Sequence, residues 1–189
     1  PTTAQHVWHD MQGKIAGIVD DGPTTVGVES TVIDMSATIP TILRPGAVTQ
    51  QQLEAVLGVR VVDATSTKSV ASDVTPKAPG MKYRHYAPDK NVVMFDRLDA
   101  LTLKEVLQKN DVVMAQDATI AAMAIPKEKT WSLGESLETA TEQLFAGLRY
   151  YDDEATVATI YVEKMPPIGI GKAFNNRLGK AAGNQEFNI

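Results

Sequence analysis

From Asn91 to Ile189 the sequence alternates between short apolar runs and longer amphipathic stretches, and this alternation constrains the fold more than any other feature. Apolar runs at 92–95, 111–115 and 156–162 predict strands. Apolar residues at i, i+4, i+7 and i+11 from Leu137 to Tyr151 predict the longest helix, and a final helix is expected from Ile170 to Ala182, ending at Gly183. Because strands alternate with helices, we expect an α/β domain with a mostly parallel sheet.

Weaker signals complete this half of the chain. Leu101 to Leu107 predicts a short helix, and 130–133 an edge-like third strand. Residues 118–124, which are small and apolar, are interpreted as a loop or a single helical turn. Ser132 with Glu135 has the spacing of a capping box and predicts the start of the long helix there.

The first 62 residues contain shorter elements. A helix capped by Thr2 or Thr3 is expected to reach about Met11, and Thr49 opens a capping box for a helix closed by Gly58. Short strands are expected at 14–19, 26–34, 41–44 and 59–62.

Ser30 and Arg44 are the two candidate site residues in this part. Ser30 alternates with valines along its predicted strand, so its hydroxyl needs a partner, either a neighbouring strand or a ligand. Arg44 ends an apolar strand just before Pro45-Gly46. Its planar fork suits either a phosphate or carboxylate group or a surface ion pair.

Residues 63–90 carry no apolar period and are interpreted as an inter-domain linker or an active-site lid. The last part reads Ala78-Pro79-Gly80-Met81-Lys82-Tyr83-Arg84-His85-Tyr86-Ala87-Pro88. Cations and planar rings at this density suit a planar anion such as a nucleotide. The alternative is a plain linker whose tyrosines pack on a neighbour.

Composition limits the other function classes. The chain has a net charge of −5, which argues against nucleic-acid binding through net charge, and it has no cysteine. It has no run of about 18 apolar residues and no signal-peptide pattern, so we expect a cytoplasmic protein without a membrane partner. Because the first residue is Pro1, the chain is expected to be a processed product or a fragment. His6 and His9 are interpreted as part of a polar helix face, not as metal ligands.

The chain does not match either of two common nucleotide-binding motifs. Gly169 and Gly171 lack the third glycine of a dinucleotide-binding fingerprint, and Gly171-Lys172 lacks the remainder of a P-loop. The polar run 175–177 on the last helix is interpreted as a solvated face rather than a ligand-binding one.

Three motifs and the end of the chain carry a family resemblance. They are Val26-Gly27-Val28-Glu29-Ser30-Thr31-Val32-Ile33-Asp34, then Ile42-Leu43-Arg44-Pro45-Gly46, then the segment 78–88, followed by Leu144-Phe145-Ala146-Gly147-Leu148-Arg149, Gly169-Ile170-Gly171, Asn176-Arg177-Leu178 and Lys180-Ala181-Ala182. In this order they resemble the two-domain form of threonylcarbamoyl-AMP synthase, which joins a YrdC-type domain to a Rossmann-like domain.

The resemblance implies an enzyme that condenses L-threonine, bicarbonate and ATP into threonylcarbamoyl-AMP and pyrophosphate with Mg²⁺, for the modification of tRNA. It implies that Ser30 binds L-threonine and that Arg44, His85 and Tyr86 contact ATP. Direct contact of this chain with nucleic acid is not expected.

The chain departs from the family pattern because the Lys/Arg and Ser-x-Asn motifs of the YrdC-type domain are absent. We therefore expect residues 1–62 to be the last part of such a domain, 63–90 to be the linker and 91–189 to be the whole Rossmann-like domain. The chain alone is expected to be inactive. The alternatives are a non-catalytic nucleotide-binding or lid module, and a purely structural domain that rigidifies the linker.

Overall fold

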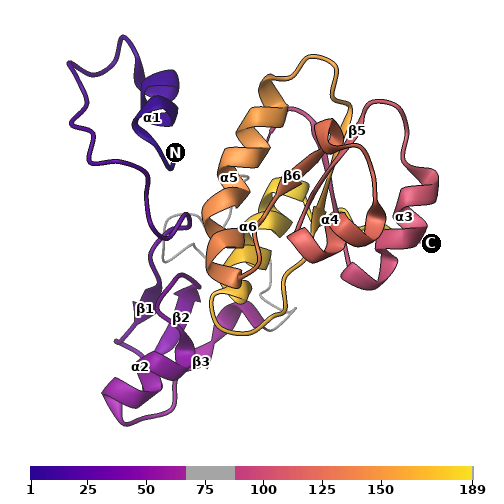
Figure 1. Cartoon of the computed structure of the whole chain (residues 1–189). Helices are drawn as coiled ribbons and strands as arrows, with labels where there is room; N and C mark the ends of the chain where they lie inside the picture. The colour runs from indigo at the N-terminus through magenta and orange to yellow at the C-terminus, as the bar shows by residue number, and fades with distance from the viewer. Residues whose placement is uncertain (67–87, 189) are drawn as a thin grey trace.

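The computed structural model describes residues 1–66 and 88–188, so most of the predicted linker, including His85 and Tyr86, lies outside the described residues. Within the described ranges the chain forms a three-stranded sheet with two helices, followed by a four-stranded sheet with helices on both faces (Figure 1).

The second sheet is entirely parallel, as the strand–helix alternation predicts. Its strands are β4 (Asn91–Phe95), β5 (Asp111–Ala115), β6 (Thr130–Ser132) and β7 (Thr159–Glu163), in the spatial order β4-β7-β5-β6. All five residues of β5 are buried, which is typical of a central parallel strand covered on both faces. The α/β class is confirmed.

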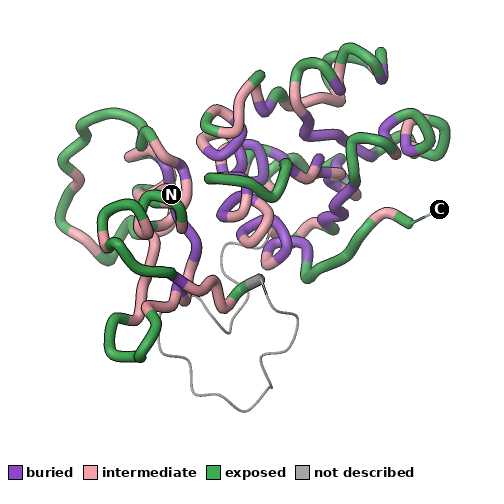
Figure 2. Tube along the Cα trace, turned by 90° about the horizontal axis from the view of Figure 1, so that it is seen from below, coloured by how far each residue is buried: buried purple, intermediate pink, exposed green. Residues whose placement is uncertain are grey.

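Helices cover both faces of this sheet, and each face has its own apolar core. On one face α5 (Leu137–Asp153) and α6 (Gly171–Ala182) bury Leu144, Phe174 and Leu178. On the other face α3 (Ala100–Val106) and α4 (Asp117–Met123) bury Leu103 and Met123. Figure 2 shows the buried residues concentrated in this half of the molecule.

The first part of the chain has far less core. Its elements are α1 (Ala4–Met11), β1 (Val32–Asp34), β2 (Thr41–Arg44), α2 (Gln50–Leu57) and β3 (Val62–Asp63). Between residues 1 and 66 the hydrophobic core has only two large buried members among the described residues, Ile42 and Val61, beside the buried Pro45 of the turn after β2. Since a segment with so little core gains little free energy by folding alone, its position depends on contacts with other parts of the protein.

Three strand predictions in this part need correction. The run 59–62 is a strand only from Val62, where β3 begins. No strand forms at 14–19, where Val19 is 98% exposed and the described residues place no paired strand beside it. The run 26–34 is a strand only from Val32 onward. Gly27 has a φ of +75°, which takes it out of the extended region, and the backbone there packs against α5 instead of another strand. The predicted strand at 41–44 is confirmed.

Two predictions around the helices are also wrong. Residues 117–123 form a seven-residue helix, not a loop or a single helical turn, and its inward face buries Thr119 and Met123. The cap of α5 is Ser136 paired with Thr139, one turn later than the predicted Ser132. The Ser132 hydroxyl instead donates to Asp117 and accepts the N–H of Gly134.

The carboxyl end of β7 carries a buried acid that the sequence does not reveal. Glu163 is 1% exposed and accepts hydrogen bonds from the N–H of Gln116 at 2.8 Å and the hydroxyl of Thr119 at 2.9 Å. Burial raises the pKa of this carboxyl, and its two donors act in the opposite direction. Glu163 therefore fastens the start of α4 to the end of β7.

We expect Glu163→Gln to change the free energy of unfolding by less than about 1 kcal/mol, because an amide can still accept from Gln116 and pair with Thr119. Glu163→Leu should cost about 1–3 kcal/mol, since it leaves both donors without an acceptor. Urea unfolding of the two variants at neutral pH measures the difference. Equal stability of the two variants would show that these hydrogen bonds do not hold α4.

Candidate functional site

The structure brings together the two site residues that the sequence singles out in the first part. Arg44, at the end of β2, donates from Nε to the backbone carbonyl of Ser30 at 3.0 Å and from Nη2 to the Ser30 hydroxyl at 3.2 Å. Ser30 is exposed and Arg44 is half-buried. A hydroxyl and a guanidinium therefore lie side by side at a solvent-facing rim.

The turn after β2 determines where Ser30 lies. A Cβ on Gly46 would sit 2.3 Å from the backbone nitrogen of Thr31 and 2.5 Å from the carbonyl oxygen of Glu29, so only glycine permits this approach. The hydroxyl of Thr31 donates to the carbonyl of Val48 at 2.7 Å. Residues 29–31 are therefore held against the turn that follows Arg44.

The other side of the same segment packs on the parallel-sheet domain. A Cβ on Gly27 would lie 2.3 Å from the carbonyl oxygen of Thr141 in α5, and Val28 packs against the core beneath α5 and α6. Glu29 Oε2 lies 2.8 Å from Nε of Arg177 on α6. The Arg177 side chain is 3% exposed and that of Glu29 is 27% exposed, so the arginine side of this ion pair is buried at the junction between the two parts of the chain.

Arg177 contradicts the prediction of a solvated helix face at 175–177. Asn175 faces inward too, donating to the carbonyl of Met165 and accepting its N–H. The sequence did contain the signal: with a period of 3.6 residues, Arg177 falls on the same stripe as Phe174, Leu178 and Ala181. Glu29 and Arg177 are thus the residues near the site that sequence reasoning missed.

Further cations lie close to this ion pair. Lys180 is one helical turn beyond Arg177, and its pKa is lowered first by burial and then by the positive charge of Arg177. Glu29 acts in the opposite direction, whereas Arg44 lowers the pKa of Lys180 further. Cations of α6 and of β2 therefore share one neighbourhood with the carboxylate of Glu29.

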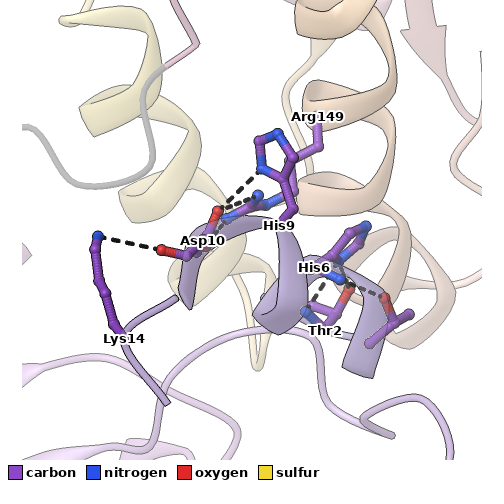
Figure 3. A network of polar contacts seen from close by, with 7 residues as sticks. Thr2, His6, His9, Asp10, Lys14 and Arg149 are labelled. Atoms are coloured by element: carbon purple, nitrogen blue, oxygen red, sulfur yellow. Dashed lines mark hydrogen bonds and ion pairs between the residues drawn. The ribbon is translucent and has the colours of Figure 1, made fainter. Parts of the chain in front are cut away.

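A second ion pair joins α1 to α5, as Figure 3 shows. The guanidinium of Arg149 donates to both oxygens of Asp10, at 2.9 and 2.5 Å. The Arg149 hydrogen bond lowers the pKa of Asp10 to about 2. In the same network His6 Nδ1 accepts from the backbone N–H of Thr2 at 3.2 Å, which agrees with a polar role for this helix face.

Two cavities border this region, and neither is lined by Ser30 or Arg44. One of about 510 Å³ is lined by Pro1, Thr2, Phe145 and residues 24–29. The other, of about 190 Å³, lies between α1 and α5 beside the Asp10–Arg149 pair. Among the described residues no cluster of three or more metal-ligating side chains occurs. His85 and Tyr86, the remaining candidate site residues, lie outside the described residues.

The fold and the site together define an α/β protein of two parts, in which a parallel-sheet domain supports an exposed serine–arginine pair suited to a small polar or anionic ligand. A family model described as threonylcarbamoyl-AMP synthase, C-terminal domain, matches residues 48–183, and the chain belongs to this family. A second model, described as telomere recombination and carrying YrdC in its name, matches residues 1–46.

Curated relatives agree with the family assignment. The chain is 39% identical to threonylcarbamoyl-AMP synthase of Bacillus subtilis, with 98% of this chain and 54% of that protein covered. It is 39% identical to the enzyme of Pyrococcus abyssi, with 97% and 54% covered, and 33% identical to that of Schizosaccharomyces pombe, with 96% and 48% covered. The chain therefore spans about half the length of the curated relatives it matches.

Solved structures give the same result. The crystal structure of P. abyssi Sua5 complexed with L-threonine superposes with a TM-score of 0.80 at 35% identity, covering 100% of this chain and 56% of that one. A second P. abyssi Sua5 structure, of a variant with a consecutive histidine and tyrosine replaced by alanine, gives a TM-score of 0.80 at 34% identity, with coverages of 100% and 55%.

We expect Gly46→Ala to separate residues 29–31 from the turn after β2, because the new methyl group would overlap backbone atoms that cannot rotate away. Faster amide hydrogen exchange at Ser30 and Thr31 measures this change. Gly58→Ala is the matched control in this part, because a Cβ on Gly58 would meet nothing within 4 Å, although its φ of +67° makes the substitution strain the end of α2 locally. Exchange at Ser30 that responds equally to both variants would contradict the close-approach argument.

The Asp10–Arg149 pair predicts an acid-dependent contribution to stability. Because the pKa of Asp10 is about 2 in the folded protein, below its ordinary value of 3.8, the contribution is fully present above the ordinary pKa and is lost as the pH falls through about 2. Asp10→Asn should cost about 1 kcal/mol or less near neutral pH, since water screens a partly exposed pair. Urea unfolding between pH 6 and pH 2 should show this difference shrinking; a constant difference would contradict it.

Proposed function

We propose that this chain is the C-terminal part of an enzyme that forms L-threonylcarbamoyl-AMP and pyrophosphate from L-threonine, bicarbonate and ATP. The observation that carries the proposal is the hydrogen-bonded pair of Ser30 and Arg44 at an exposed rim. The product serves threonylcarbamoyladenosine formation on tRNA, in the cytoplasm. None of the helices in the described part of the chain is long and apolar enough to cross a membrane.

In this proposal residues 1–62 form the end of a YrdC-type domain, 63–90 the linker and 91–189 the Rossmann-like domain. The nucleotide-binding motifs of the YrdC-type domain belong to the part of the family's length that this chain does not span. Net charge gives no support for direct tRNA contact, so the partners are the small substrates and the enzymes that use the product.

The chemistry requires positioning and charge neutralisation. The amine of L-threonine and bicarbonate form a carbamate with loss of water, and a carbamate oxygen then attacks the α-phosphorus of ATP as pyrophosphate leaves. Ser30 binds L-threonine through its hydroxyl, and Arg44 offers N–H donors to phosphate oxygens, on which negative charge develops. Alignment of two anionic reactants depends on such fixed donors.

His85 and Tyr86 complete the proposed ATP site. The solved variant of P. abyssi Sua5 with a consecutive histidine and tyrosine replaced supports this choice, since the present chain has one histidine followed directly by tyrosine, His85-Tyr86.

Mg²⁺ is part of the proposal because it pairs with triphosphate oxygens and is usually held by phosphates and only one or two carboxylates. The described residues offer no cluster of three ligands, and Glu29, the acid next to Ser30, already pairs with Arg177. These residues therefore do not fit a metal site of their own.

In the full-length protein, Ser30→Ala should raise the KM for L-threonine about tenfold or more, the loss expected for a hydrogen bond to a charged group. Arg44→Ala should raise the KM for ATP at least as much, since it removes a phosphate donor. Pyrophosphate release, with the product identified by mass spectrometry, measures both constants.

Arg60→Ala is the control for the arginine variant, because Arg60 is an exposed arginine of the same part of the chain. A full-length protein that makes no threonylcarbamoyl-AMP would overturn the proposed activity. Activity with an unchanged KM for L-threonine in Ser30→Ala would overturn the role of Ser30 alone.

A further inference from the structure

The junction between the two parts of the chain contains a buried arginine, Arg177, that has no role in the proposed chemistry. Arg177 lies in the middle of α6 on its inward stripe and is 3% exposed. Its Nε lies 2.8 Å from Oε2 of Glu29. Since a buried guanidinium is stable only when it is paired, Glu29 is held at this point of α6.

The position of Glu29 restrains the position of Ser30 in the candidate site. Ser30 is the next residue along the chain, and Arg44 donates to its backbone carbonyl at 3.0 Å. On the far side, Gly46 leaves no space for residues 29–31 to move outward against the β2 turn. Residues 29–31 are therefore restrained by α6 on one side and by the turn after β2 on the other.

The charged residues around Glu29 add an electrostatic contribution to this restraint. The positive charges of Arg177 and Arg44 both lower the pKa of Lys180, whereas the negative charge of Glu29 raises it. Like charges that lie close together repel one another, most strongly where water is excluded. Glu29 offsets the repulsion felt by Lys180, so loss of its carboxylate would remove a compensating negative charge as well as the anchor of the backbone on α6.

We propose that Arg177 of the parallel-sheet domain is a positioning residue for the Ser30–Arg44 site, acting through its buried ion pair with Glu29. This inference rests on the proposed function for its substrate, L-threonine. It assigns to the C-terminal domain a part in substrate binding: α6 holds the segment whose next residue contacts the substrate.

The test is a double-mutant cycle in the full-length protein with Glu29→Gln, Arg177→Gln and both together. Each single variant should raise the KM for L-threonine about ten- to hundredfold, the range expected for residues coupled within one charged network, while kcat changes less than about threefold. The double variant should be no worse than the worse single variant. Arg177→Lys, which keeps the charge but loses the fork, should recover part of the loss.

Lys172→Gln is the matched control. Lys172 lies on the same helix and forms an ion pair of 3.5 Å with Asp63 of the first part, but it is nearly a helical turn and a half away from Arg177. It should leave the KM for L-threonine unchanged. If Arg177→Gln fails to fold, Glu29→Gln carries the test, because its side chain is partly exposed and the substitution preserves shape.

Variants that lower the unfolding temperature but keep the KM for L-threonine would overturn the inference and leave a purely structural ion pair. Hydrogen exchange separates this failure from that of the proposed function. If the wild-type protein makes no product, Ser30 and Thr31 amides should still exchange faster in Arg177→Gln than in Lys172→Gln. Equal exchange in the two variants would overturn the positioning role whatever the reaction is.

Discussion

The buried ion pair between Arg177 and Glu29 is the interaction on which the arrangement of the two parts depends. A guanidinium removed from water is costly unless an anion and hydrogen-bond acceptors surround it, and Glu29 lies 2.8 Å away. The first part has little apolar core of its own, so its placement relies on such contacts with α5 and α6. The Asp10–Arg149 and Lys172–Asp63 pairs act at other points of the same junction.

Close backbone approach complements the charges. Gly27 brings the segment onto α5, and Gly46 brings the β2 turn onto the segment from the opposite side. Both faces of the backbone at 27–31 are therefore occupied, whereas the side chain of Ser30 remains exposed. An irregular segment clamped in this way can present a side chain as accurately as a regular strand, because its neighbours leave it no alternative position.

The parallel sheet acts as a support in this arrangement. In open α/β sheets, ligands commonly bind at the carboxyl ends of the strands. Here the described side chains at those ends bond one another: Glu163 with Thr119, Asp117 with Ser132, and Lys164 with Asp96 at 2.8 Å. The mutual bonding of these side chains agrees with the missing third glycine of the dinucleotide fingerprint. The candidate site instead lies on the α5–α6 face, where the first part packs.

Periodicity and caps predict the α/β class, the parallel sheet and, to within a few residues, the helices at 4–11, 50–57 and 137–153, because these signals depend on neighbouring residues. The local chemistry of Ser30 and Arg44 likewise identifies them as candidate site residues. The sequence did not determine that 26–31 would leave the strand, that residues 14–19 would find no partner strand, or that Arg177 would be buried against Glu29. Strand pairing and burial depend on residues far apart along the chain. The packing of α6 against the first part places Arg177 beside Glu29, the residue that precedes Ser30.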